Sequence, residues 1–151
     1  MIPVYLRMDQ ILDAKGKKVK GNSNVRDLNN PVNGNRIRTV ASARNKVAAA
    51  SQMRGRTSPI IYYDEYAFSP YNQIVYTNMV PAYNTAANNC KRIGSPHGIY
   101  ITTTPGILTT DEGKHANDFR LAATPFQEKW YDKTKQELDE ILAANNNSNF
   151  V

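Results

Sequence analysis

The sequence predicts a doubly wound α/β domain, in which a mostly parallel sheet lies between layers of helices. Two short runs, residues 60–63 and 99–101, consist of β-branched and aromatic residues and have the length of strands buried on both faces. An alternating run at residues 36–41 precedes them, and helical patterns lie between the three runs. The order strand, helix, strand, helices, strand predicts parallel strands joined by right-handed crossovers.

The composition is that of a globular protein with one core. The 151 residues are 40% hydrophobic and 21% charged, which argues against the membrane and disordered classes. Pro3 and Arg7 interrupt the apolar start, so we expect neither a signal peptide nor a spanning helix. The single cysteine, Cys90, excludes an internal disulfide. The two histidines, His97 and His115, are expected in loops, and with one cysteine they are too few for a metal-ligand cluster. The lack of disulfides predicts a cytosolic setting.

The positive charge is concentrated in the first part of the chain. Residues 1–60 hold 12 Lys and Arg against 3 Asp and Glu, whereas residues 61–151 hold 7 against 10. With a net charge of +6 and a pI near 9.5, this asymmetry suits contact with a polyanion, either nucleic acid or nucleotide phosphates. A solvated basic surface without a partner is the alternative.

The first third of the chain is expected to contain a loop or hairpin, a strand and a helix. Residues 14–35 carry several Gly and Asn turn signals and no aromatic residue, so nucleic acid would be bound there through phosphates. Residues 36–41 predict a strand. A helix over residues 42–53 is expected to begin at the N-cap Ser42 and to stop at Gly55. The candidate DNA-binding residues are Lys15, Lys17, Lys18, Lys20, Arg36 and Arg38.

Prolines and glycines predict the limits of the later helices. Pro70 is expected at the first position of a helix that Pro81 interrupts, and a second helix then ends at Gly94. In the last helix, Thr124 is the predicted N-cap and forms a capping box with Gln127. We therefore expect a first region over residues 1–123 and an amphipathic helix with the start of a connection over 124–151. The apolar stripe of this helix, expected to pack in the core, consists of Phe126, Trp130, Thr134, Leu138, Ile141 and Leu142.

Two adjacent carboxylates end the run at residues 60–63. Open α/β sheets bind their ligands at the carboxyl ends of parallel strands, so Asp64 and Glu65 are expected at a site rather than in the core. This is the Walker B arrangement, in which the first acid binds the magnesium of a nucleotide and its neighbour accepts a proton from the attacking water. The alternative is a strand that simply stops where charge begins.

Three segments in order resemble the central part of the ATPase domain of terminase large subunits, the DNA-packaging motors of tailed bacteriophages. They are residues 54–68 (RGRTSPIIYYDEYAF), the Met79-Val80-Pro81 interruption and residues 100–106 (YITTTPG), and the resemblance covers about residues 36–110. It implies a RecA-like fold of the ASCE P-loop NTPase type, with a three-layer parallel sheet, ATP and Mg²⁺. The roles that it implies are metal ligand for Asp64, catalytic base for Glu65, trans-acting arginine for Arg54 or Arg56, and coupling motif for Thr102, Thr103 and Thr104.

The resemblance also implies partners and a location. The implied partners are double-stranded DNA, the portal, the small terminase subunit and other copies of the chain in a ring, without a membrane. The implied location is the host cytoplasm, at the portal vertex of the procapsid. No G-x-x-x-x-G-K-[ST] motif occurs, so the phosphate-binding part of the fold is missing from these residues and we expect the isolated chain to be inactive. The alternatives are another nucleic-acid-dependent NTPase, such as a helicase, and a non-catalytic basic module that binds DNA or an assembly.

Overall fold

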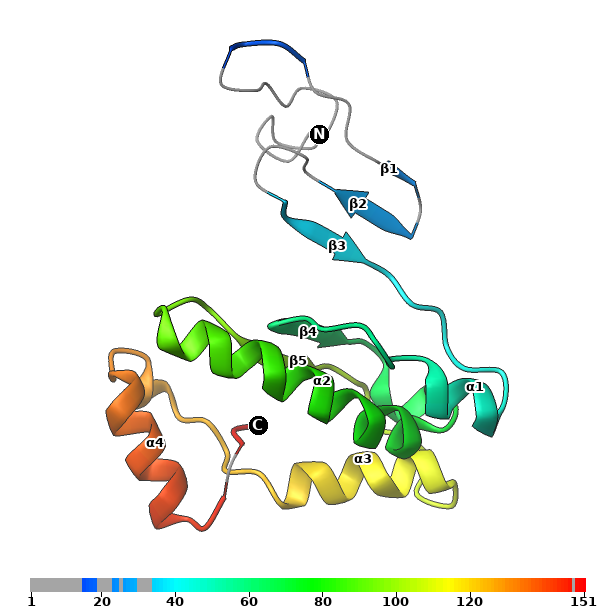
Figure 1. The fold of residues 1–151 in the computed structure, drawn as a ribbon. Coiled ribbons are helices and arrows are strands. Elements are labelled where there is room, and N and C mark those ends of the chain that lie inside the picture. Colours follow the sequence, from blue (N-terminus) through cyan, green and yellow to red (C-terminus); the bar gives the residue numbers. More distant parts are fainter. Residues whose placement is uncertain (1–14, 19–22, 25, 30–33, 148) are drawn as a thin grey trace. The chain divides into compact units, whose positions relative to one another are not determined.

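The computed structural model describes residues 15–18, 23–24, 26–29, 34–147 and 149–151. The fold is mixed α/β, and the chain divides into two compact units, Met1–Ala41 and Ser42–Val151 (Figure 1). Within the described part, no helix combines the length and apolar character needed to cross a membrane.

The first unit contains a small antiparallel sheet. Its strands are β1 (Ser23–Asn24), β2 (Asp27–Asn29) and β3 (Arg36–Arg38), in that spatial order. Of the loop or hairpin predicted for residues 14–35, the structure shows a hairpin, because β1 and β2 pair antiparallel. The prediction that residues 36–41 form a strand of the parallel sheet is wrong, because β3 pairs antiparallel with β2, with Leu28 opposite Ile37.

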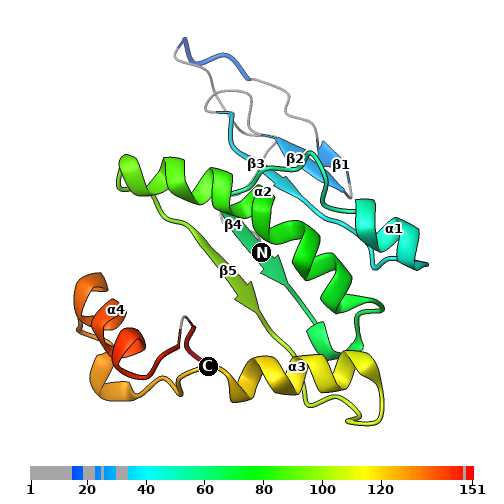
Figure 2. The same ribbon diagram turned by 60° about the horizontal axis from the view of Figure 1, so that its bottom comes forward.

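The second unit is built around a parallel pair of strands. β4 (Ile60–Tyr63) pairs with β5 (Gly98–Ile101), as predicted, and α2 (Asn72–Arg92) connects them along one side of the pair (Figure 2). Among the described residues this sheet has two strands. β4 is not buried on both faces, because Ile61 is 8% exposed while Ile60 and Tyr62 are 51% and 64% exposed.

α2 is one continuous helix that contains Pro81, so the predicted interruption at this residue is wrong. A proline removes the hydrogen bond to the carbonyl four residues earlier. Thr77 and Pro81 are both exposed, so the carbonyl that loses its partner lies on the solvent side. The neighbouring turns are held by buried Met79 and Ala86. Tertiary packing thus keeps the helix intact across the proline.

The predicted stop of α2 is confirmed in detail. Gly94 has a φ of +66°, a backbone conformation that glycine adopts without steric cost. The N–H of Ser95 donates to the Cys90 carbonyl at 2.9 Å, and the N–H of Gly94 donates to the Lys91 carbonyl at 3.4 Å. This is the Schellman arrangement, which satisfies carbonyls that the helix leaves free and turns the chain towards β5.

Two shorter helices pack beside α2. α1 (Lys46–Ser51) begins at Asn45, whose Oδ1 accepts from the Ala48 N–H at 2.8 Å, so the predicted cap at Ser42 is wrong. α1 packs on α2 through Ala49, which is fully buried, and Val75. α3 (Asp111–Leu121) was not predicted, although Thr110 caps it by accepting from the Gly113 N–H.

α3 carries His115 into an aromatic cluster, so the expectation that this histidine lies in a loop is wrong. The cluster centres on Tyr66, which belongs to the short 3₁₀ helix η3 (Tyr66–Phe68) and is 1% exposed. The Tyr66 hydroxyl lies 3.1 Å from His115 Nδ1, and the Phe119 ring packs edge-on against that of Tyr66. Burial raises the pKa of Tyr66, so its hydroxyl stays protonated, and the tautomer of the imidazole decides which of the two groups donates.

The C-terminal segment differs most from the prediction. Residues 125–134 hold only the 3₁₀ helix η4 (Glu128–Trp130), and the helix α4 (Lys135–Ala144) starts ten residues later than expected. The backbone of Thr124 pairs with the chain end, donating to the Asn149 carbonyl and accepting from the Val151 N–H, both at 2.9 Å. This extended pairing is incompatible with a helix that begins at Thr124.

α4 has its own capping box, formed by Thr134 and Glu137. The Glu137 carboxylate accepts from the Thr134 N–H at 2.8 Å and from Lys133 at 3.0 Å. The Thr134 bonds, followed by the Lys133 contact, lower the pKa of Glu137 to about 2, so the box stays charged across the neutral and mildly acidic range.

Thr134→Ala should lower the free energy of unfolding by about 1 kcal/mol, because it removes an N-cap side chain. Gln127→Ala should change it by less than about 0.5 kcal/mol, because Gln127 makes no side-chain cap bond in this structure. Urea unfolding of both variants would measure the difference. A larger loss of unfolding free energy for Gln127→Ala than for Thr134→Ala would indicate that the helix starts at Thr124.

Stability should fall as the pH drops below about 6.5, the ordinary pKa of histidine. Burial lowers the pKa of His115, with Asp118 opposing the shift, so the unfolded chain binds the proton more readily than the folded chain. The stabilisation is complete above the unfolded pKa and is lost as the pH falls through the folded value. Urea unfolding between pH 7.5 and pH 5 should show this decline in the parent and in His97→Gln. An undiminished decline in His115→Gln would contradict the assignment.

Candidate functional site

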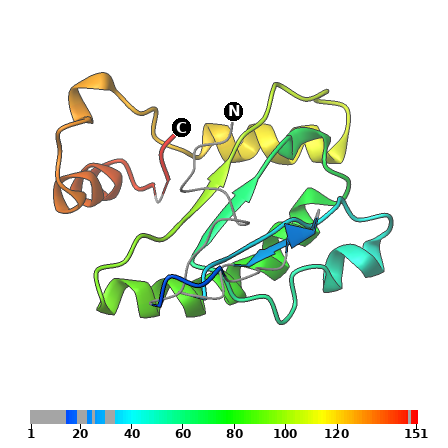
Figure 3. The ribbon, with the colours of Figure 1, turned by 90° about the horizontal axis from the view of Figure 1, so that it is seen from above.

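The candidate site lies where the carboxyl ends of β4 and β5 meet, near α3 (Figure 3). Pairing continues past both strands. The Thr102 N–H donates to the Tyr63 carbonyl at 3.0 Å, and the Tyr66 N–H donates to the Thr102 carbonyl at 3.1 Å. The segment that starts at Asp64 and the segment that starts at Thr102 are therefore held side by side by their backbones.

Thr102 and Asp64 are joined directly. The Thr102 hydroxyl donates to Asp64 Oδ1 at 2.7 Å, and the Glu65 N–H donates to the same oxygen at 3.1 Å. The Tyr62 hydroxyl lies 2.9 Å from Thr102 Oγ1. Because the one hydroxyl proton of Thr102 goes to Asp64, Tyr62 is the donor in this pair. Asp64 Oδ2 makes no hydrogen bond with the described residues, so the exposed carboxylate keeps one oxygen for a ligand.

Glu65 is held in an uncommon conformation next to this pair. Its φ of 50° and ψ of 47° are left-handed, which costs a non-glycine residue roughly 1–2 kcal/mol. The Phe68 N–H donates to its carbonyl at 3.0 Å, and the Thr104 hydroxyl lies 3.5 Å from its Oε2. The turn directs the Asp64 and Glu65 side chains to the strand ends, together with Thr102 and Thr104.

Thr103 has a different part in the same loop. Its hydroxyl accepts from the Ala67 N–H at 3.0 Å and donates to the Thr104 carbonyl at 2.8 Å, so it caps η3 instead of contacting the acids. Gly106 lies against the same short helix. A Cβ at Gly106 would be 2.7 Å from the Ala67 Cβ, closer than real side chains approach. The threonine loop therefore fits tightly onto η3.

Asn72 is a buried residue that supports the site through hydrogen bonds. It was not identified from the sequence. It is 1% exposed, and its Nδ2 donates to the carbonyls of Tyr66 and Glu112, each at 3.0 Å. The Glu112 carboxylate in turn accepts from the Tyr71 N–H at 3.1 Å. These bonds tie η3, the start of α2 and the start of α3 together. An asparagine in the first turn of a helix has no sequence pattern that would show such a role.

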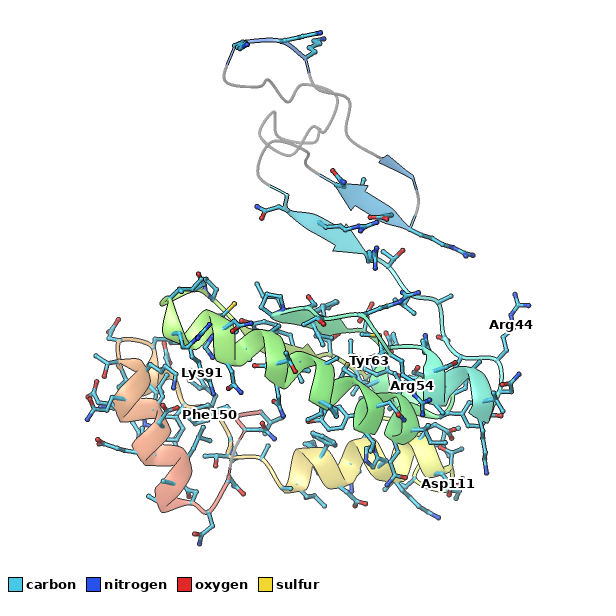
Figure 4. The ribbon with its side chains drawn as sticks, viewed as in Figure 1. Arg44, Arg54, Tyr63, Lys91, Asp111 and Phe150 are labelled. Carbon is cyan, nitrogen blue, oxygen red and sulfur yellow. The ribbon has the colours of Figure 1, made fainter. Side chains whose placement is uncertain are left out.

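The structure does not bring the predicted arginines into contact with the two acids. Arg54 and Arg56 are exposed in the turn after α1, where the Arg54 N–H donates to the Ser51 carbonyl at 3.1 Å. Neither side chain forms an ion pair with a described residue. Figure 4 shows Arg54 beside α1, whereas Tyr63 lies between the strands and α2.

The predicted DNA-binding residues belong to the first unit. Lys15, Lys17 and Lys18 are exposed, and Lys20 lies outside the described residues. The Arg36 guanidinium binds Asp27 through two hydrogen bonds, one of them Nε to Oδ1 at 2.6 Å, and lowers the pKa of that carboxyl. Arg38 Nε lies 3.8 Å from the same carboxylate, so one acid partly neutralises both arginines.

The donors at the strand ends suit a magnesium ion that is bound mainly by phosphate and water. In the described part of the chain, no group of three or more His, Cys, Asp or Glu side chains could form a metal site of its own. Asp64 and Glu65 supply carboxylate oxygens, and Thr102 a hydroxyl, all hard ligands. Mg²⁺ with a nucleotide is commonly held by one or two protein carboxylates together with the phosphates, and the residues present fit this case.

Comparisons of the chain with family models, with curated proteins and with solved structures found no match.

Asn72→Ala should lower the free energy of unfolding by roughly 2–4 kcal/mol, because it leaves the Tyr66 and Glu112 carbonyls without their buried donor. Asn89→Ala is the matched control, since Asn89 is exposed and, among the described residues, its side chain bonds that of Arg92 alone. It should change stability by less than about 0.5 kcal/mol. Urea unfolding measures both. Equal, small losses would show that Asn72 is not the tie between η3 and α3.

Proposed function

We propose that this chain is part of an ATPase of the terminase type, in which ATP hydrolysis drives double-stranded DNA into a viral procapsid. The observation that carries the proposal is the 2.7 Å bond from the Thr102 hydroxyl to Asp64. It joins an acidic motif and a hydroxyl motif, 38 residues apart, at the carboxyl ends of adjacent parallel strands. Nucleotide-binding α/β proteins place their phosphates at this position.

Asp64 and Glu65 have separate roles in the proposal. Asp64 keeps a free oxygen for Mg²⁺, which would offset the charge that develops on the transferring phosphoryl group. Glu65 is the base that accepts a proton from the attacking water. The strained backbone at Glu65 supports a functional role, because such strain persists where the surrounding structure holds a side chain in a required place.

The threonines connect the phosphate to the rest of the unit. Thr102 and Thr104 lie at the acids, and Thr103 and Gly106 seat the same loop on η3. A hydroxyl can exchange its bond to a carboxylate for one to a phosphate oxygen at little cost. A change of partner at Thr102 would therefore be transmitted through the loop to η3, which suits a coupling motif.

The rest of the proposed motor completes the site. A RecA-like sheet of three layers would add a phosphate loop, with its lysine, beside β4 and β5. Arg54, with Arg56 as second choice, would act on the nucleotide of a neighbouring subunit in a ring. DNA would be bound through the lysines at 15–20 with Arg36 and Arg38, and the portal and small subunit would complete the assembly at the procapsid in the host cytoplasm.

In the complete motor, Glu65→Gln should lower the rate of ATP hydrolysis by about 10²-fold or more while nucleotide binding is kept, because the base is lost but its shape remains. Asp64→Asn should reduce both hydrolysis and Mg²⁺-dependent binding. Asp132→Asn removes an exposed acid far along the chain from the site and should leave both unchanged. Steady-state phosphate release and nucleotide titration measure the two effects.

Two outcomes would contradict the proposal. One is hydrolysis by the Glu65→Gln motor at the parent rate. The other is Mg²⁺-dependent ATP turnover by the isolated 151-residue chain that Glu65→Gln abolishes, because the chain would then bind phosphate without the missing loop.

A further inference from the structure

Four cationic residues lie in or next to α1 and form what we call the α1 basic surface: Arg44, Lys46, Arg54 and Arg56. All four are exposed. Residues 42–63 contain these four cations and no acid, whereas residues 64–151 contain seven cations and ten acids. Within the second unit, the excess positive charge is therefore confined to this surface. Figure 4 shows Arg44 and Arg54 in the chain on either side of α1.

The four cations of the α1 basic surface form no ion pair with a described residue. Other cations of the same unit do find partners: Lys133 pairs with Glu137, Lys135 with Asp139, and Lys129 lies over the Trp130 ring. Like charges that share one surface without counter-charges repel one another. Such a group costs free energy that a bound polyanion would recover.

The backbone under these side chains is well packed. α1 has six residues and a length of about 9 Å, with Arg44 and Lys46 at one end and Arg54 and Arg56 beyond the other. Ala43 and Ala49 are buried against Val75 of α2, and Asn45 caps the helix start. Lys46 lies on α1, and the other three cations lie in the chain just before and just after this packed helix.

The neighbouring residues select the kind of ligand. Residues 42–59 contain no aromatic side chain, so there is no platform on which single-stranded bases could stack. Val47 is the one large exposed apolar side chain in this segment, which is too little to insert into a lipid surface. Three of the four cations are arginines, whose planar guanidinium matches phosphate in two-point contacts. These features favour a phosphate backbone over stacked single-stranded bases or a lipid surface.

We propose that the α1 basic surface binds the phosphate backbone of a duplex nucleic acid, without base specificity and without nucleotide hydrolysis. This inference goes beyond the proposed function, whose DNA contacts lie at residues 15–38. It also gives Arg54 and Arg56 a role that can be measured on the chain alone, in contrast to an action on a neighbour's nucleotide.

The test compares two variants of the 151-residue chain that each lose four positive charges. The first is R44Q/K46Q/R54Q/R56Q, and the matched control is K91Q/R92Q/K114Q/R120Q, whose positions are also exposed. Fluorescence anisotropy measures binding to a short DNA duplex and to the same duplex as RNA, at salt concentrations between about 50 and 200 mM. Circular dichroism confirms that both variants are folded.

For the parent, binding should weaken steeply with salt. The slope of log Kobs against log salt should become shallower by about 3 to 4 in the first variant, since each phosphate contact contributes about 0.9. The control should change the slope by less than about 1. DNA and RNA duplexes should behave alike, because the contacts are to phosphates.

Equal effects of the two variants would overturn the proposal, because only net charge would then matter. Unchanged duplex binding in the first variant would also overturn it, including the case in which that variant loses binding to vesicles containing phosphatidylserine instead. Neutralising Lys15, Lys17, Lys18 and Lys20 in a third chain tests the DNA contacts of the proposed function separately. This binding experiment does not depend on ATP hydrolysis, so its outcome is independent of whether the ATPase proposal holds.

Discussion

The pairing between β4 and β5 is the constraint on which the candidate site depends. Two further hydrogen bonds, from Thr102 to Tyr63 and from Tyr66 to Thr102, continue this pairing past the strands. A slip of one residue would point every side chain of one strand to the other face and separate Thr102 from Asp64. The contact between hydroxyl and acid therefore follows from the register of the two strands, although both side chains are exposed.

A second layer of contacts holds the strained turn at the end of β4. The backbone of Glu65 is left-handed, which costs roughly 1–2 kcal/mol. Favourable contacts of the neighbouring residues offset this cost. Tyr66 is buried in the aromatic cluster, Asn72 binds its carbonyl, and Gly106 allows the threonine loop to close onto Ala67. The exposed acids are thus carried by a turn whose other side is among the best-packed parts of the unit.

The second unit also separates its charges along the chain. The two acids at the strand ends suit a hydrated cation, and the α1 basic surface suits phosphate. Our two proposals assign both features to chemistry with polyanions. They differ in what holds them: hydrogen bonds to neighbouring hydroxyl and N–H groups orient the acids, whereas the four cations have no ion-pair partner among the described residues.

Local chemistry in the sequence was sufficient for the elements that depend on it. The β-branched and aromatic runs predicted β4 and β5, Gly94 predicted the end of α2, and the charges after Tyr63 predicted exposed acids at a strand end. Each of these depends on the preferences of a few adjacent residues. The order of elements predicted parallel strands between helix layers, and the described residues contain one parallel pair of strands with helices.

Tertiary contacts decided the remaining features. Thr124 and Thr134 both precede a glutamine or glutamate by three residues, and the sequence favoured the first as a cap. The backbone of Thr124 is instead engaged by Asn149 and Val151, which leaves Thr134 to start the helix. Pro81 likewise stays inside α2 because buried neighbours hold the helix around it. In both cases, contacts between residues distant in the chain outweigh a local preference of about 1–3 kcal/mol, and such contacts leave no pattern in the sequence.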